Sequence, residues 1–365
     1  MTEYLHGLLD PQLFSNIIRF RIKCRKVEKK HMDERRERDY TLDYLRALGT
    51  ALVIFAHITT PTGILEIRTF DVTMLVFVSG ASYALSAKEK QILHTKEYFE
   101  YIFNRFKRLI VPTWIFLTLY FILFHLLNLC GVTDVYFTLK DYMGSYLLVS
   151  GIGFVWVIRV YFLMAIIAPI LLTAIRKMKK PTFYMSLILA AGLQSILVKT
   201  LKIENGALWK MVELIVPYML GYGIVYALGM KYALGKKNVV KKFIVFAMIF
   251  FGYAIVMRFP SINALKYPPH IYYLAYGLFM TYLIIYVVNA CGGGDKKSKA
   301  IQFVSKNSLL IYYWHAIPLR FVEYHIIHIE LNIWSKYFFV LSSALLLTVI
   351  HLQMKKAING LVVKN

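Results

Sequence analysis

The stretch GFVWVIRVYFLMAIIAPILL (residues 153–172) carries a single charged residue, Arg159, in an otherwise apolar run. A helix needs about 20 such residues to cross the roughly 30 Å hydrocarbon core of a bilayer. Similar runs recur along the 365 residues, of which 58% are hydrophobic and 17% are charged. Soluble domains carry about 25% charged residues, so the composition excludes a soluble globular protein. Continuous apolar runs also argue against a membrane β-barrel, whose strands alternate in polarity.

The apolar runs predict an all-α polytopic membrane protein with about ten transmembrane helices. The expected spans are residues 43–60, 68–87, 109–130, 155–175, 182–199, 211–230, 240–258, 270–290, 302–321 and 334–354. Residues 141–153 are expected to form a short re-entrant or interfacial segment before the fourth span. This organisation leaves no room for a large soluble domain.

Lys and Arg number 43 and Asp and Glu 20, which gives a net charge of +23. The positive residues cluster between alternate apolar runs, a pattern typical of cytoplasmic loops. We therefore expect a multi-pass protein of the plasma (inner) membrane, with both termini cytoplasmic and contacts to anionic lipid rather than nucleic acid. Residues 1–38 are expected to be a basic leader or an interfacial helix, 39–356 the transmembrane domain and 357–365 a short cytoplasmic tail.

The first expected span contains three ionisable residues, Asp43, Arg46 and His57. Arg46 and His57 are eleven residues apart, which places them on nearly the same helix face, about 16 Å apart along the axis. An ionisable group in the hydrocarbon core costs roughly 2.5 kcal/mol or more, so this stripe should face the bundle interior. Two readings stay open: a functional stripe, or a boundary Asp43–Arg46 pair with an interfacial histidine.

The second expected span opens with Arg68 and Asp71 at its outer end. Asp71 could hydrogen-bond one nitrogen of His57, fix its tautomer and raise its basicity, as a general base requires. The alternative is an outer-surface ion pair between Arg68 and Asp71. Ser79 and Gly80, further along, are typical of a close approach between transmembrane helices.

Two arginines just before the third span, Arg105 and Arg108, are three residues apart and so lie on one helical face. Guanidinium forks bind phosphate bidentately, so the pair suits a phosphorylated ligand arriving from the cytoplasm. The alternative is a topology signal, which every polytopic protein carries. Arg159, near the outer end of the fourth span, either snorkels outward or points inward at a ligand.

The ninth expected span carries Ser308 and His315 on an aromatic-rich helix. A lone histidine there is either structural or functional. The three cysteines, Cys24, Cys130 and Cys291, are far apart and odd in number. They indicate neither a disulfide framework nor a metal site.

Five of these stretches, in this order, resemble acyltransferase family 3, integral membrane enzymes that O-acetylate bacterial surface glycans. The matching residues are Asp43, Leu45, Arg46 and His57; Phe77, Ser79 and Gly80; Arg105, Arg108, Leu109, Ile110 and Pro112; Trp156, Arg159, Tyr161 and Pro169; and Ser308, Ile311, Tyr312 and His315. The resemblance covers about residues 38–354. Two positions depart from the pattern, Thr73 where many relatives have Asp and Val157 where the pattern has Phe.

The resemblance implies an O-acetyltransferase that takes an acyl group, most often acetyl, from cytoplasmic acyl-CoA and delivers it to a hydroxyl of a surface or lipid-linked glycan. It implies acyl-CoA as co-substrate, with no metal and no tightly bound cofactor. The implied roles are His57, Arg46 and Asp71 as catalytic residues, Arg105 and Arg108 as acyl-CoA ligands, and Arg159, Arg68 and His315 on the acceptor or oxyanion side. The alternative is a transporter of a glycan or lipid intermediate with a polar path through the membrane.

Overall fold

The computed structural model describes residues 40–58, 61–87, 95–201, 207–235, 238–294, 296–323 and 332–362. These residues form helices and turns, with no strand among them, which confirms the predicted all-helical class. The helices are α3 (Thr41–Ala56), α4 (Thr62–Arg68), α5 (Asp71–Ser86), α6 (Thr95–Leu129), α7 (Leu139–Tyr146), α8 (Trp156–Lys177), α9 (Lys180–Leu201), α10 (Ala207–Leu234), α11 (Val239–Val256), the 3₁₀ turn η2 (Asn263–Leu265), α12 (Ile271–Ala290), α13 (Lys299–Trp314), α14 (Ala316–Glu323) and α15 (Ile333–Val362). The expected leader, 1–38, and residues 363–365 of the expected tail lie outside the described residues.

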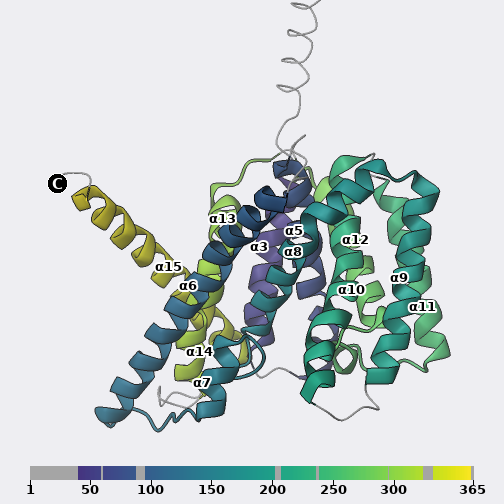
Figure 1. Cartoon of the computed structure of the whole chain (residues 1–365). Helices are drawn as coiled ribbons and strands as arrows, with labels where there is room; N and C mark the ends of the chain where they lie inside the picture. The colour runs from purple at the N-terminus through teal and green to yellow at the C-terminus, as the bar shows by residue number, and fades with distance from the viewer. Residues whose placement is uncertain are drawn as a thin grey trace, which may run out of the picture.

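Within the described chain, 7 helices are long and apolar enough to cross a membrane. They are α6, α8, α9, α10, α11, α12 and α15. Successive long helices run up and down beside one another (Figure 1). Each helix pairs its own backbone N–H and C=O groups, as a hydrocarbon environment requires. The chain is therefore a multi-pass membrane protein.

Three of the ten expected spans are short helices in the structure. α3, α5 and α13 have 16 residues each, about 24 Å of helix at 1.5 Å per residue. Crossing the hydrocarbon core takes roughly 30 Å. α5 packs against α3, α10 and α12, and α13 packs against α3 and α15. These short helices thus form the interior of the bundle, and the ten-span topology stays a prediction.

Prolines determine where α3 and α13 end. Pro61 and Pro318 lack the N–H that would bond to the carbonyl four residues earlier, and their rings clash with that carbonyl. α3 therefore ends at Ala56 with His57 as its cap, and α13 ends one residue before His315. His57 consequently caps the C-terminus of α3. His315 lies at the junction of α13 and α14, where its carbonyl oxygen accepts from the backbone N–H of Leu319.

Helices α5 and α10 approach each other at two glycines. A Cβ atom on Gly80 would lie 2.2 Å from the carbonyl oxygen of Tyr226. A Cβ on Gly229 would lie 2.1 Å from the carbonyl oxygen of Phe77. The two backbones are thus in contact in both directions, which confirms the close approach that the sequence indicated at Gly80.

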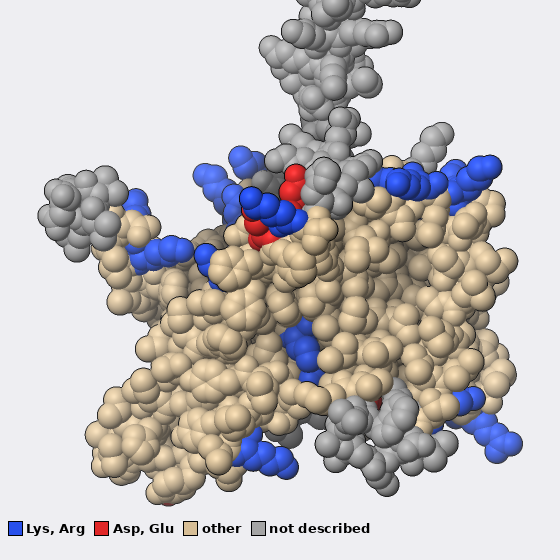
Figure 2. Space-filling view, viewed as in Figure 1, with Lys and Arg blue, Asp and Glu red and all other residues tan. Residues whose placement is uncertain are grey.

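Charged side chains gather at the two ends of the bundle. Figure 2 shows Lys and Arg, with some Asp and Glu, along the upper rim, a largely uncharged belt below it with basic atoms visible at its centre, and fewer positive residues at the lower rim. The upper rim is the end where α6 begins, and it includes Lys96 on α6, Lys177 on α8, Lys231 on α10 and Lys241 on α11. We call it the basic end. The other, the opposite end, includes the first residues of α5, α8 and α12.

Candidate active site

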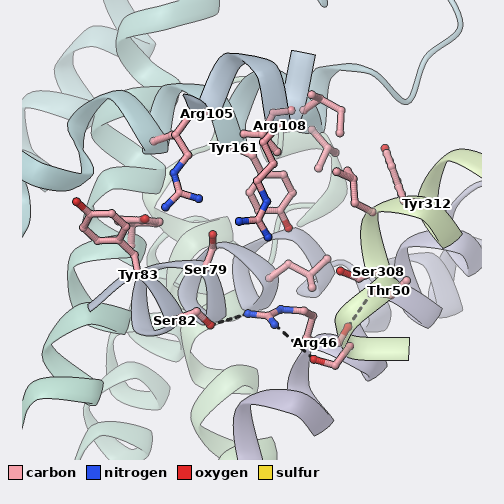
Figure 3. Close-up of a pocket in the computed structure, with 18 of the residues that line it drawn as sticks. Arg46, Thr50, Ser79, Ser82, Tyr83, Arg105, Arg108, Tyr161, Ser308 and Tyr312 are labelled. Atoms are coloured by element: carbon pink, nitrogen blue, oxygen red, sulfur yellow. Dashed lines mark hydrogen bonds between the residues drawn. The ribbon is translucent and has the colours of Figure 1, made fainter. Parts of the chain in front are cut away.

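A cavity of about 510 Å³ lies between α3, α5, α6, α8 and α13. Ligand pockets typically enclose about 300–1,000 Å³. Its wall carries four basic residues, Arg46, Arg105, Arg108 and Lys306, and none of the described residues that line it is acidic. Figure 3 shows Arg105 and Arg108 reaching in from α6 and Arg46 from the facing side. The three guanidinium groups converge on one space, which suits an anionic ligand.

Arg46 is held by hydroxyl groups from two neighbouring helices. One guanidinium nitrogen donates to Ser82 Oγ on α5 at 2.5 Å, and the other donates to Ser305 Oγ on α13 at 3.4 Å. Ser305 in turn donates to Asp43 Oδ1 at 2.6 Å. Ser305 thus bridges Asp43 and Arg46 and links α13 to α3. Sequence reasoning missed Ser82 and Ser305 because small hydroxyl residues are common in transmembrane helices.

Arg105 lies against two aromatic rings at the mouth of this cavity. Its guanidinium carbon is 5.0 Å from the ring centre of Tyr101 and 5.9 Å from that of Tyr83, a cation–π arrangement that orients the side chain. A hollow of about 350 Å³ shares Tyr101, Arg105 and Arg108 with the cavity and follows the first turns of α6. The cavity and this hollow place the two arginines at an entrance from the basic end.

A pair of histidines lies behind the wall of the cavity that Tyr312 forms. Tyr312 lines the cavity, and its ring centre is 5.1 Å from that of His315. The rings of His315 and His57 have centres 5.3 Å apart, and Phe154 packs edge-on against both. His57 is half-buried, whereas His315 is fully buried. The structure therefore brings together two histidines that the sequence placed in different spans.

The hydrogen bonding of His315 defines which of its nitrogens is basic. Its Nδ1 pairs with the backbone carbonyl oxygen of Tyr312, which can only accept, so Nδ1 carries the proton. Nε2 then presents its lone pair in the neutral ring. This nitrogen is buried and makes no hydrogen bond within the described part of the chain. His315 can therefore accept a proton or a hydrogen bond at Nε2.

Asp71 is occupied by partners other than His57. Its Oδ2 accepts from Arg68 at 2.7 Å, while Oδ1 accepts from the backbone N–H of Val72 at 2.8 Å and lies 3.6 Å from Lys266 Nζ. No hydrogen bond joins Asp71 to His57 among the described contacts. The Arg68–Asp71 pair exists, but it is buried rather than on the surface. The charges of Arg68 and Lys266 also interact with the His57 ring.

Lys266 is a site residue that sequence reasoning missed. It lies in the connection between α11 and α12, and only 4% of the residue is exposed. Burial lowers the pKa of its ammonium group, and the neighbouring Asp71 carboxylate acts in the opposite direction. The sequence around a loop lysine does not indicate that it is buried, because its burial depends on how the loop packs against the helices.

Arg159 points into the protein rather than snorkelling outward. Its guanidinium donates to the carbonyl oxygen of Leu148 at 3.0 Å and lies 5.0 Å from the ring centre of Tyr218. A cavity of about 190 Å³ beside it, at the opposite end of the bundle, is lined by Arg159, Trp156, Tyr218 and Tyr267. The structure thus separates Arg159 from the cavity of Arg46, Arg105 and Arg108.

Apolar helices around a basic internal cavity define a multi-pass membrane protein with a ligand site between its helices. A comparison with protein-family models matches residues 39–352 to the acyltransferase domain of acyltransferase family 3. The match covers nearly the whole chain, so the protein belongs to this family and is a membrane acyltransferase, which confirms the resemblance and favours an enzyme over a transporter. Searches of curated proteins and of solved structures found no match.

Proposed function

We propose that this acyltransferase moves an acyl group, most often acetyl, from cytoplasmic acyl-CoA to a hydroxyl of a surface or lipid-linked glycan. One observation carries the proposal. A single cavity has arginines that converge at one side and, at the other, a tyrosine in contact with the histidine pair. A donor with phosphates at one end and a thioester at the other fits this polarity.

The donor enters from the basic end in this proposal. Coenzyme A carries a pyrophosphate and a ribose phosphate. Arg105 and Arg108 bind these phosphates, and Arg46 lies deeper in the cavity. The basic end faces the cytoplasm in a ten-span topology with both termini inside, which the distribution of Lys and Arg supports. The protein then resides in the plasma (inner) membrane, where acyl-CoA is available on one face only.

The histidine pair performs the chemistry in this proposal. His57 takes the proton of the acceptor hydroxyl as that oxygen attacks the thioester carbonyl carbon. The new C–O bond forms, the C–S bond breaks, and coenzyme A leaves as a thiolate that receives the proton from His57. Arg46 lies about 16 Å along the helix axis from His57, so it binds the donor and does not contact the reacting carbonyl group. Arg68 and Arg159 hold the acceptor, and Asp71 positions Arg68.

Labelled acetyl-CoA tests the proposal directly. Membranes that contain the protein are incubated with [¹⁴C]acetyl-CoA, and label is followed into the glycan fraction. We expect incorporation by the wild type and its loss in His57→Ala, since general-base catalysis contributes about 10²–10⁴-fold. His125→Ala removes an exposed histidine of α6 and is the matched control. Equal labelling by wild type and His57→Ala, or by membranes without the protein, would overturn the assignment. Succinyl-CoA in place of acetyl-CoA tests the choice of acyl group.

A further inference from the structure

At the opposite end of the bundle, the α11–α12 connection carries a lysine into the protein interior. The carboxylate of Glu66 on α4 fixes this connection by accepting from Ser261 Oγ at 2.5 Å and from the backbone N–H groups of Ile262 and Asn263 at 2.6 and 3.1 Å. Lys266 follows directly and is buried beside Asp71. The loop is therefore built to hold one ammonium group inside the protein.

Buried positive charge exceeds buried negative charge in this region. Asp71 is fully buried and is shared by two cations, Arg68 and Lys266. Arg159 is a third buried cation, and among the described residues its guanidinium contacts a carbonyl oxygen and an aromatic ring rather than a carboxylate. Glu213, five residues before Tyr218 on α10, forms no ion pair among the described residues. A buried charge is costly unless it is paired, so the surplus points to an anion from outside the chain.

Two guanidinium nitrogens identify where that anion belongs. The Nε atoms of Arg68 and Arg159 are buried and make no hydrogen bond within the described ranges. Arg68 is 6% exposed and Arg159 is 9% exposed, so neither has bulk water as a substitute partner. Buried N–H donors are almost always paired in native proteins. Each therefore offers a donor to a bound group.

Aromatic side chains connect Lys266, which neighbours Asp71, to the cavity beside Arg159. Trp156 and Tyr267 pack edge-on with ring centres 4.9 Å apart, and Lys266 Nζ lies 5.5 Å from each ring centre. The same two rings, with Tyr218, line the cavity of about 190 Å³ beside Arg159. Flat apolar faces with polar edges stack on the C–H faces of sugar rings while leaving hydroxyls free to hydrogen-bond. The region thus combines aromatic rings on which a sugar can stack with more buried positive than negative charges.

We propose that the acceptor glycan carries a phosphate ester, which Lys266, Arg68 and Arg159 hold while its sugar stacks on the wall of Trp156, Tyr218 and Tyr267. The proposal rests on the proposed function, because it assigns the acceptor of that reaction. This site is separate from the donor cavity, whose arginines lie toward the basic end. Lys266 is the residue that it adds to the acceptor side.

Binding of a matched pair of ligands tests the proposal without turnover. The full chain is placed in phosphatidylcholine nanodiscs, and two compounds are titrated by calorimetry: glucose joined to a farnesyl chain through a phosphodiester, and glucose joined to the same chain by a plain glycosidic bond. We expect the wild type to bind the phosphodiester at least about tenfold more tightly, the effect of one charge-assisted hydrogen bond. Equal affinities would overturn the proposal, and this comparison needs no variant.

A pair of variants then locates the effect. Lys266→Met should lose most of the preference for the phosphodiester and keep its affinity for the glycoside. Arg258→Met removes one exposed cation from the same connection and should retain the preference. Lys266→Gln replaces Lys266→Met if the latter has a lowered Tm. An equal loss of the phosphodiester preference in the Lys266 and Arg258 variants would mean that general surface charge causes the preference. That result would overturn the assignment to Lys266.

Two further experiments distinguish a glycan site from a lipid-headgroup site, and phosphate binding from acyl transfer. Phosphatidylglycerol added to the nanodiscs should not displace the phosphodiester. Displacement that depends on Lys266 would assign the site to a lipid headgroup and overturn the acceptor assignment. The second experiment asks whether label from acetyl-CoA is transferred to either compound. If neither compound is labelled but the Lys266-dependent preference for the phosphodiester remains, the proposed acyl transfer is wrong and the phosphate site is retained.

Discussion

The imidazole rings of His57 and His315 lie with their centres 5.3 Å apart, although 258 positions separate the two residues in sequence. Each ring follows a helix that a proline brings to an end, Pro61 for α3 and Pro318 for α13. Two helix ends therefore converge on the place where the proposed reaction moves a proton.

Replacing His315 tests whether the two rings act together. His315→Asn places an amide N–H near the position of Nδ1, so the hydrogen bond to the Tyr312 carbonyl persists while the basic Nε2 is lost. We expect a folded enzyme whose kcat falls by about 10²-fold or more, as for loss of a general base. Steady-state kinetics with acetyl-CoA and an unchanged Tm check both parts.

The double variant separates a shared role from two independent roles. Residues that act as one unit are strongly non-additive in their effects on rate. We expect His57→Ala with His315→Asn to be hardly slower than His57→Ala alone. If the losses of kcat in the two single variants multiply in the double variant, the two histidines contribute independently. His315 would then not act together with the base, His57.

Lysine in place of both arginines tests the donor entrance. Arg105→Lys with Arg108→Lys keeps the positive charge but removes the bidentate forks and the stacking of Arg105 on Tyr101. We expect the KM for acetyl-CoA to rise about tenfold or more, since a hydrogen bond to a charged group contributes about 1.5–3 kcal/mol. Topology and amount of protein should not change, because the positive-inside signal counts charge alone.

The control for this variant is Lys177→Arg, a charge-conserving change at an exposed position of the basic end. It should leave the KM unaltered. An unchanged KM in the double lysine variant would make Arg105 and Arg108 a topology signal only. The donor would then have to bind near Arg176–Lys180 instead.

Tyr312 connects the donor cavity to the histidines, and its hydroxyl donates to the carbonyl oxygen of Phe154 at 2.5 Å. Tyr312→Phe leaves that buried carbonyl without this donor, so we expect a loss of about 1–3 kcal/mol of stability. The Phe154 ring packs on both histidines, so kcat should fall as well. Tyr313→Phe is the comparison, because it removes a hydroxyl contact of 2.9 Å with Thr113 on the other side of the helix. Equal kinetics in the two variants would deny Tyr312 a role in positioning.

The sequence predicted the all-helical class, the family and an inward-facing Arg46, because each has a local signature. Long apolar runs identify helices in lipid, and Arg46 is too costly to face hydrocarbon. Helix length was less predictable. Residues 43–60 look like one continuous span, yet α3 stops at Ala56 because Pro61 removes a hydrogen bond.

The partners of site residues were beyond sequence reasoning for a different reason. From the sequence, Asp71 could either orient His57 or pair with Arg68, and the structure shows the pair with Arg68. Lys266, from a distant loop, lies beside the same carboxylate. Ser305 was likewise brought to Asp43 by the packing of α13 on α3. Such contacts depend on which helices become neighbours, and periodicity in one helix contains no information on its neighbours.

The close contact between α5 and α10 should determine the stability of the bundle. Gly229→Ala would place a methyl group 2.1 Å from the carbonyl oxygen of Phe77, which forces the two backbones apart. Overpacking costs about 1–3 kcal/mol, so we expect a lower Tm in detergent, together with lower activity because α5 carries Ser82, the partner of Arg46. Gly192→Ala on α9 is the matched control, since a Cβ there meets nothing within 4 Å. It should be neutral or slightly stabilising, because alanine favours the helix. Equal Tm values for the two variants would show that α5 and α10 can separate at no cost.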